Sequence, residues 1–322
     1  MKPKKKLSPD MLFNDWCAYW LEHTSYSRSL TTNAKYEEII VHVIQPVFTE
    51  KILSRVELQD VQNFISSLKV KGLRPSRVAM IRTILNMIME DAVNHNLLVR
   101  NPAALAQSEK RTRREIKILN DNDIILLLEL KNKSVYVRLL LFTLALGLRI
   151  GETLGLSWNN IDLEKGNVII SQQLTSYYKD GKTNNALLPY TKTRKDRTLP
   201  LPEIAKEILS EQRKFYVENP NYLVFTEEDG KPIVYPMFYY QFTKLMYQIG
   251  RPDITPHSLR HTTATTLLYN TKDILLVKEM LGHKSLNTTG HYPTVTLQER
   301  QEAANAIDEY FAVYMEELMS CS

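Results

Sequence analysis

The stretch from Thr255 to Tyr292 constrains this chain most, because it crowds four of the seven histidines around a single arginine. Its first residue is a favourable helix N-cap, and the proline after it suits the first helical position, so a helix is predicted to begin here. That helix places His257, Arg260 and His261 at positions i, i+3 and i+4, on neighbouring parts of one face.

The second half of the stretch predicts a turn at a histidine, followed by a tyrosine. Gly282 stands where a C-cap glycine belongs, closing an expected helix over Asp273–Leu281. His283 would then lie at the turn, and Tyr292 follows nine residues later. Two imidazoles, a guanidinium and a phenol brought together suit an anionic ligand that a phenolate attacks.

The length of 322 residues predicts two domains, each with its own hydrophobic core. A hydrophobic fraction of 43% is too high for a disordered chain. Cys17 and Cys321 lie at opposite ends, which is no disulfide framework and fits a reducing cytoplasm. The longest mainly apolar run, Leu139–Leu148, is too short to span a bilayer. We therefore expect a cytoplasmic protein that does not cross a membrane.

The positive charge is concentrated in the first third of the chain. Residues 1–115 carry 18 Lys and Arg against 12 Asp and Glu, a net charge of +6, while the remainder carries 23 against 24. A basic domain of this kind has the electrostatic footprint of a nucleic-acid binder. The second domain is close to neutral, mainly because its C-terminal tail is acidic.

Four amphipathic helices are predicted before Asn101, which indicates a small all-α domain. The polar run QSEKRTRREIK follows and is the best candidate for a linker. Its basic side chains could follow a phosphate backbone, although a merely soluble connector has a similar composition. The arginines in question are Arg111, Arg113 and Arg114.

The second domain begins with a capping-box pattern and a buried helix over Ser134–Leu146. The run GLRIGE follows and places Arg149 three residues before Glu152. A buried arginine is costly unless it is paired, so this one is expected to serve a carboxylate or a phosphate.

From Trp158 the hydrophobic pattern changes to a period of two, which predicts strands. One hairpin is expected over Asn159–Asp162 and Asn167–Leu174. A second is expected over Leu187–Thr191 and Arg197–Leu201, joined by a polar turn. Lys192 lies at the rim of that turn, beside other cations that suit an approaching phosphate or simply a solvated turn: Arg194, Lys195 and Arg197.

The last predicted helix runs over Leu297–Met319. Its apolar side chains fall on one side: Ala303, Ile307, Tyr310, Phe311, Tyr314 and Leu318. This acidic helix could dock on its own domain or on a neighbouring subunit.

Five ordered pieces of this sequence resemble the tyrosine recombinases, also called phage integrase family site-specific recombinases. They are ALGLRIGE, TKTRKDRTLPL, TPHSLRHTTAT, LGHKS and the tyrosine nine residues after the histidine of LGH. HSLRH alone would be weak evidence, because its HxxxH spacing also suits a metal site. The pieces span Ala145 to Tyr292, and the helical first domain matches the family by pattern.

The resemblance implies a mainly α fold with a small antiparallel β-sheet. It implies a helical core-binding, DNA-binding domain over 1–108 and a basic linker over 109–115. A mixed catalytic domain with a C-terminal helix would follow over 116–322, and the two domains would form a C-shaped DNA clamp.

The resemblance also assigns roles in phosphate recognition. Arg149 and Arg260 would clamp the non-bridging oxygens of the scissile phosphate, a task that suits forked guanidiniums. His257 would help through a hydrogen bond or as a base, and His283 would support the same oxygens. Glu152 would hold Arg149.

Lys192 would protonate the departing 5′ oxygen, and Tyr292 would be the nucleophile that forms a 3′-phosphotyrosine. A phenol with a pKa of about 10 needs nearby cations and a histidine to react at neutral pH. The covalent intermediate keeps the phosphodiester bond energy, so no ATP, cofactor or metal is implied. Six arginines and lysines are expected to contact DNA: Arg111, Arg113, Arg114, Arg194, Lys195 and Arg197.

The implied partner is double-stranded DNA, bound by a homotetramer in which the C-terminal helix contacts a neighbour. An accessory directionality factor and association with the nucleoid are further expectations. Integration or excision of a mobile element is favoured over Xer-like dimer resolution, partly because the segment Gln172–Pro189 is long. The short N-terminus favours the opposite, because only about ten residues precede the first helix, so that either this member lacks an arm-binding domain or the chain was cut.

Two further alternatives remain, a type IB topoisomerase-like activity and a catalytically inactive DNA-binding homologue. Every catalytic position that the resemblance predicts is filled, which argues against the inactive homologue. Whether Tyr292 acts in cis or in trans stays open.

Overall fold

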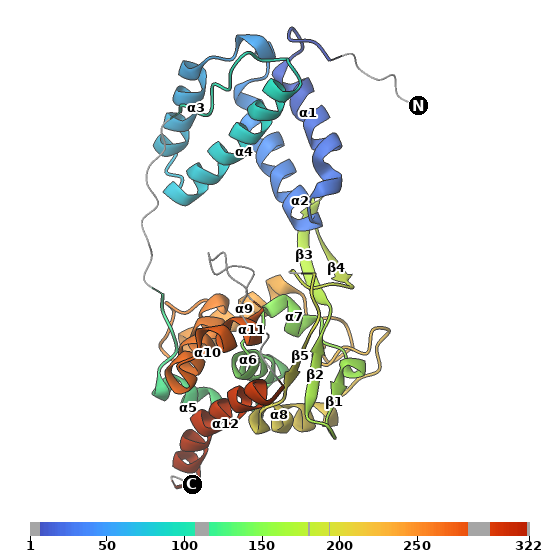
Figure 1. The fold of residues 1–322 in the computed structure, drawn as a ribbon, viewed down its shortest axis with the longest axis vertical. Helices are drawn as coiled ribbons and strands as arrows, with labels where there is room; N and C mark the ends of the chain where they lie inside the picture. Colours follow the sequence, from blue (N-terminus) through green and yellow to red (C-terminus); the bar gives the residue numbers. More distant parts are fainter. Residues whose placement is uncertain (1–6, 107–115, 180, 193, 283–296, 321–322) are drawn as a thin grey trace. The chain divides into compact units, whose positions relative to one another are not determined.

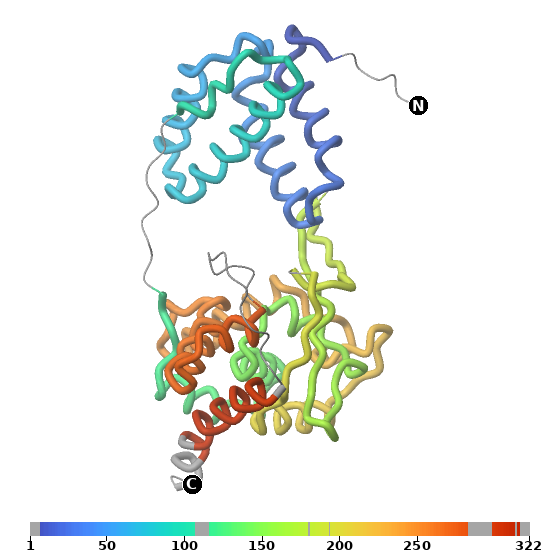
Figure 2. The backbone as a smooth tube through the Cα atoms, viewed as in Figure 1, coloured from blue at the N-terminus to red at the C-terminus, as the bar shows by residue number. Residues whose placement is uncertain are grey.

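The computed structural model describes residues 7–106, 116–179, 181–192, 194–282 and 297–320. The chain divides into two compact units, traced in Figure 1 and Figure 2. One is Met1–Arg114 with Tyr177–Asn184, and the other is Glu115–Ser176 with Asn185–Ser322. The predicted linker over 109–115 lies outside the described residues. The functions assigned to the two domains stay predictions.

The first unit contains the four helices that the apolar periodicity predicts. They are α1 Phe13–Thr24, α2 Leu30–Ile39, α3 Leu58–Val70 and α4 Pro75–Asn94. A π-helical turn, Ile40–Ile44, continues α2, and short 3-10 turns lie at Ser25–Ser27, Gln45–Val47 and Leu53–Arg55. Trp16 is fully buried in the core, and its indole nitrogen donates a hydrogen bond of 3.0 Å to the carbonyl of Ile88. This bond ties α1 to α4.

The second unit is mostly helical and is built around α6. Its helices are α5 Asp121–Glu129, α6 Val135–Leu146, α7 Ile150–Leu154, α8 Glu203–Lys214, α9 Tyr235–Gln248, α10 Pro256–Thr271, α11 Ile274–Leu281 and α12 Leu297–Ser320, with a 3-10 turn at Trp158–Asn160. The capping box predicted before α5 is confirmed, because Asn120 and Asp123 exchange hydrogen bonds of 2.8 and 3.0 Å. Helix α6 is buried at every residue from Val137 to Leu146 and forms the middle of the core.

The strands form two small antiparallel sheets, so the predicted fold class is confirmed. They are β1 Ile161–Asp162, β2 Asn167–Ile170, β3 Gln173–Lys179, β4 Lys182–Leu188 and β5 Arg197–Pro200. One sheet has the order β1-β2-β5, with Val168 opposite Leu199, and β3 pairs with β4 (Figure 1).

The predicted second hairpin is therefore wrong. Strand β5 pairs with β2, because Leu199 is buried there against Val168, which is itself fully buried. The chain before β5 is unsuited to the predicted pairing of Leu187–Thr191 with Arg197–Leu201. Pro189 lacks a backbone N–H, and Arg194 has a φ of 55°.

The C-terminal helix α12 packs on its own unit. Asp308 accepts a hydrogen bond of 2.6 Å from the backbone N–H of Glu203 and so satisfies the start of α8. The hydroxyl of Tyr314 donates to Asp121 at the start of α5, at 2.7 Å. Contact of this helix with a neighbouring subunit stays a prediction, since in the single chain its buried face belongs to its own core. Within the described residues, no helix is both long and apolar enough to cross a membrane.

Candidate active site

The ends of two helices meet beneath the candidate site. Gly147 closes α6 with a φ of 60°, and Gly282 closes α11 with a φ of 64°. A Cβ atom added at Gly147 would lie 2.3 Å from the Leu281 side chain, so the two helix ends touch through a glycine. Both ends present backbone carbonyls that carry partial negative charge and need partners.

Arg260, on helix α10, is the partner of these carbonyls. Its side chain is buried, with a residue exposure of 3%. Nη1 donates 2.8 Å to the carbonyl of Gly147, and Nη2 donates to the carbonyl of Leu281. Burial, followed by the charge of Arg149, lowers the pKa of Arg260 to about 9. The guanidinium is thus held where a bound anion would offset the free-energy cost of burying its charge.

Arg149 lies beside it, at the N-cap of α7. Its backbone N–H and its Nη1 donate to the two oxygens of Glu152 at 3.1 and 2.9 Å. Nη2 donates a hydrogen bond of 3.1 Å to the carbonyl of Gly282, which follows Leu281, the residue whose carbonyl accepts from Arg260. Two guanidiniums from separate helices are therefore anchored on adjacent carbonyls at the end of α11.

Glu152 is the buried counter-ion, with a side-chain exposure of 0%. Arg197 donates from Nη2 to Oε2 at 2.7 Å and from Nη1 to Oε1 at 3.3 Å. Burial raises the pKa of Glu152, but the hydrogen bonds and charge of Arg197, and then the charge of Arg149, outweigh burial and lower it overall. The carboxylate therefore stays ionised between the two arginines.

His257 and His261 lie on the same side of α10 as predicted, with ring centroids 4.5 Å apart. Partial burial lowers the pKa of His257, and the charges of His261, Arg260, Arg149 and Lys192 lower it further. Burial and then Arg260 also lower the pKa of His261. His257 is thus a neutral imidazole at pH 7, within the electrostatic reach of the predicted cations.

Lys192 lies on the turn between β4 and β5 and is exposed. The Thr191 hydroxyl, on a fully buried residue, donates 3.1 Å to the Lys195 carbonyl and closes the turn. Arg194 places its guanidinium 5.2 Å from the centroid of the Tyr190 ring. The exposure of Lys192, Arg194 and Lys195 fits contact with a ligand from solvent.

Sequence reasoning missed the position of Arg197. We grouped it with the exposed cations of the turn, but its side-chain exposure is only 8% and it is paired with Glu152. The alternation of side chains along a strand could have predicted its burial, because Arg197 and Leu199 share one face of β5 and Leu199 is buried.

Five predicted site residues lie outside the described part of the chain. They are His283, Tyr292, Arg111, Arg113 and Arg114. Gly282 is described and directly precedes His283, so the carbonyl that accepts from Arg149 belongs to the residue before the predicted histidine.

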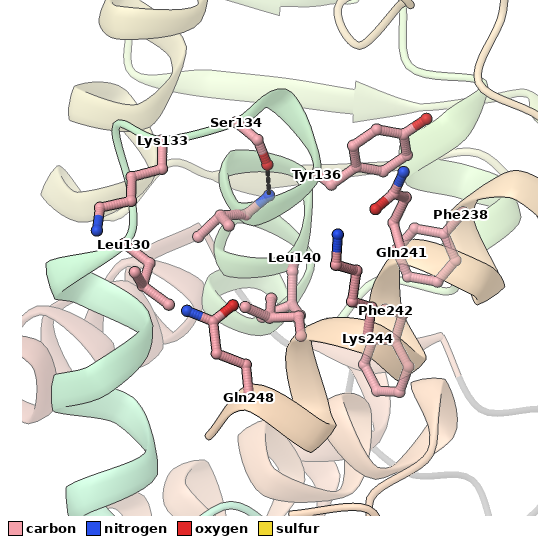
Figure 3. A pocket seen from close by; sticks show the side chains of 12 residues that line it. Leu130, Lys133, Ser134, Tyr136, Leu140, Phe238, Gln241, Phe242, Lys244 and Gln248 are labelled. Carbon is pink, nitrogen blue, oxygen red and sulfur yellow. Dashed lines mark hydrogen bonds between the residues drawn. The ribbon is translucent and has the colours of Figure 1, made fainter. Parts of the chain in front are cut away.

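A cavity of about 200 Å³ lies elsewhere in this unit, at the start of α6 and along α9 (Figure 3). Its lining includes Lys133, Tyr136 and Lys244, and none of the predicted catalytic residues. The arginine cluster is at the other end of α6, so this cavity is separate from the candidate active site. Among the described residues, no group of three or more His, Cys, Asp and Glu side chains could hold a metal ion.

Comparison with known families identifies the chain. Residues 112–299 match the model described as "Phage integrase family", and residues 12–69 match "Phage integrase, N-terminal SAM-like domain". The chain belongs to the phage integrase family. It is thus an enzyme of the tyrosine recombinase class, as the sequence motifs predicted.

Named relatives and solved structures agree with this assignment. The chain is 26% identical to the "Tyrosine recombinase XerC-like" protein of Caldanaerobacter subterraneus subsp. tengcongensis, over 94% of this chain and 84% of that protein. It is 26% identical to tyrosine recombinase XerD of Oceanobacillus iheyensis, over 85% and 87%.

A Tn1549 transposon integrase in complex with transposon right end DNA has the same fold. Its TM-score is 0.70 at 19% identity, over 94% of this chain and 100% of that one. A lambda integrase tetramer bound to a Holliday junction gives a TM-score of 0.68 at 14% identity, over 89% and 81%.

Proposed function

We propose that this recombinase cuts and rejoins double-stranded DNA through a 3′-phosphotyrosine at Tyr292, and that it integrates and excises a mobile element. The observation that carries the proposal is the pair of guanidiniums bonded to adjacent carbonyls, Arg149 to Gly282 and Arg260 to Leu281. Two forked cations side by side suit the two non-bridging oxygens of one phosphodiester.

In the proposed reaction the hydroxyl oxygen of Tyr292 forms a bond to phosphorus while the bond to the 5′ oxygen breaks. The phenolic proton passes to the neutral imidazole of His257 or to water. Lys192 gives a proton to the departing 5′ oxygen, and Arg149, Arg260 and His283 stabilise the charge on the phosphate oxygens. The product keeps one phosphodiester charge, so the reverse reaction needs no external energy source.

We propose that two basic segments contact DNA, the β4–β5 turn and the stretch that precedes the catalytic unit in the sequence. Arg194 and Lys195 are exposed and would contact phosphates, as would Arg111, Arg113 and Arg114. We further propose a homotetramer on DNA, an accessory directionality factor and a nucleoid-associated cytoplasmic location. The lambda integrase tetramer on a Holliday junction supports the tetramer by likeness of fold alone.

The choice of a mobile element rests on the β3–β4 hairpin and on the fold neighbours. Each strand of the hairpin has 7 residues, in the segment that the sequence marks as long. A transposon integrase and lambda integrase share the fold. Chromosome-dimer resolution is the second candidate, because relatives named XerC-like and XerD match most of the chain.

Trapping the covalent intermediate tests the reaction and the biological role together. Two nicked suicide duplexes serve as probes, one with the junction DNA that flanks the gene for this chain and one with the chromosome-terminus site of its host. We expect wild type to form a protein–DNA adduct on the junction duplex. Tyr292→Phe should bind the duplex and form none, whereas the control Tyr269→Phe, a residue with 73% exposure on α10, should behave as wild type.

Each possible outcome has a distinct meaning. Adducts on the terminus duplex alone would favour dimer resolution, and relaxation of circles without exchange would favour a topoisomerase-like activity. Adducts with Tyr292→Phe would overturn the choice of nucleophile. A wild type that forms none on either probe would support the inactive homologue.

A further inference from the structure

Arg197 is set apart from the other cations of its sequence motif by burial. It is the first residue of β5, and its side-chain exposure is 8%, whereas Lys192, Arg194 and Lys195 in the preceding turn are exposed. An arginine is rarely buried unless something specific requires its charge. Its position therefore calls for an explanation other than direct contact with DNA.

The hydrogen bonds of Arg197 go to the carboxylate that also holds Arg149. Oε2 of Glu152 accepts from Arg197 at 2.7 Å and from the backbone N–H of Arg149 at 3.1 Å. Oε1 accepts from Arg149 at 2.9 Å and from Arg197 at 3.3 Å. Each oxygen thus has two donors, which matches the capacity of an ionised carboxylate. Arg197 supplies half of these bonds.

The same side chain also lies against the end of helix α11. A Cβ atom added at Gly282 would be 3.4 Å from Nη1 of Arg197, so the glycine lies over the guanidinium. Arg149 donates 3.1 Å to the carbonyl of that glycine. Hydrogen bonds therefore run from Arg197 through Glu152 and Arg149 to the Gly282 carbonyl and so join β5, α7 and the end of α11.

Sharing the carboxylate changes what Arg149 can do. If Glu152 had Arg149 as its sole partner, both oxygens could turn to that guanidinium in a bidentate pair, the strongest arrangement available to them. Such a pair would occupy the edge that a phosphate needs. Because Arg197 takes Oε2 at 2.7 Å, the Arg149 side chain keeps a single bond to Oε1.

We propose that Arg197 is a positioning residue for cleavage, which acts through Glu152 to hold Arg149 in the orientation that binds the scissile phosphate. The inference rests on the proposed function, because it presumes that Arg149 contacts phosphate. It adds a residue that the sequence grouped with the DNA-contacting surface.

The charges around the carboxylate agree with this arrangement. The groups that face Glu152 are Arg149 from α7, Arg197 from β5 and Arg260 from α10. Three guanidiniums around one carboxylate leave an excess of positive charge in a buried place, which an incoming phosphate monoanion would reduce. Without Arg197 the carboxylate would neutralise Arg149 more completely.

Single-turnover cleavage separates this role from a structural one. The substrate is the nicked duplex on which wild type forms adducts, and the cleavage rate and the DNA affinity are measured separately. We expect Arg197→Met to cleave about 10²-fold more slowly, because small misplacements of a catalytic group have effects of this size. Its DNA affinity should stay within about threefold, since a buried side chain makes no direct contact.

Arg197→Lys keeps the charge but loses the fork, so it should restore part of the rate. The matched control is Lys231→Met, at an exposed cation of the same unit with a side-chain exposure of 79%, which should leave both the DNA affinity and the cleavage rate unchanged. In the Glu152→Gln background, Arg197→Met should cost little more, because residues that act as a unit are not additive.

Three results would overturn the proposal. They are a wild-type rate for Arg197→Met, a loss confined to DNA affinity, and fully additive losses with Glu152→Gln. In case Arg197→Met folds poorly, Arg197→Lys provides a second test. If Arg197→Lys binds DNA normally and cleaves at the wild-type rate, the forked guanidinium is not required and the proposal is contradicted. A wild type that forms no adduct would instead remove the proposed function itself.

Discussion

The buried arginines and the β4–β5 turn carry the same sign of charge but are built in opposite ways. Arg260 has 3% exposure and bonds to two helix-end carbonyls, whereas Lys192 lies exposed on a turn. Arginine tolerates burial here because the partial negative charge at the helix ends offsets part of its desolvation. The exposed lysine keeps its hydration and the freedom of a flexible side chain.

This difference indicates that the fixed arginines and the exposed lysine have different roles in one site. Phosphate oxygens change position little during in-line displacement, so the groups that bind them gain from being fixed in advance. A general acid must deliver a proton to an oxygen that moves away, so a less constrained side chain suits that step. The predictions below test whether fixed and movable cations respond differently to substitution.

The largest effect is expected at Arg260. Arg260→Lys keeps the charge but cannot bond both to Gly147 and to Leu281 with a planar fork. The cleavage rate should fall about 10³-fold, the upper range for losing one preorganised donor. Arg251→Lys is the matched control, since Arg251 forms ion pairs with Asp123 and Asp253 in the same unit. Cleavage by Arg260→Lys within tenfold of wild type would contradict a fixed clamp.

A smaller effect on cleavage, with little effect on stability, is expected at the turn. Lys192→Ala should slow single-turnover cleavage about 10²-fold, which is typical for loss of a general acid. Its unfolding free energy should stay within about 0.5 kcal/mol of wild type, because the side chain is exposed. Thermal unfolding and cleavage measured on the same preparation check both values. Marked destabilisation would show that the turn is as tightly built as the arginine cluster.

The smallest effect concerns pH and His257. Burial and then the neighbouring charges lower its pKa below 6.5, so the imidazole stays neutral to a lower pH than an exposed histidine would. If neutral His257 is the form that assists Tyr292, cleavage should be nearly constant between about pH 8 and about pH 7 and should fall about tenfold per pH unit below the lowered pKa.

Folding stability should follow the same sign. A histidine with a lowered folded pKa contributes stability above its unfolded pKa and loses it as the pH falls through the folded value.

Rate–pH profiles of wild type and His257→Gln are the test of the cleavage prediction. An acid limb that is unchanged in His257→Gln would assign the titration to another group.

Sequence alone predicted much of this architecture. The four N-terminal helices followed from apolar periodicity, and the Arg149–Glu152 pair followed from its i, i+3 spacing after a helix-ending glycine. The buried face of α12 was also predicted correctly at Ala303, Ile307 and Phe311. These features depend on local spacing, which a sequence displays directly.

The features that the sequence did not reveal depend on contacts between distant segments. Arg197 lies 45 residues from Glu152, and its pairing follows from the placement of β5 against β2. The anchoring of Arg260 depends on Gly147, 113 residues away. Such contacts arise from the packing of whole elements, so periodicity and spacing contain little information about them.

One measurement tests the contrast between the fixed and movable cations most directly. A duplex with sulfur in place of the 5′-bridging oxygen gives a leaving group that needs no proton. Single-turnover cleavage of this duplex by Lys192→Ala should return to within about tenfold of wild type, while Arg260→Lys should stay about 10³-fold slow. Equal rescue of both variants, or rescue of neither, would contradict the account.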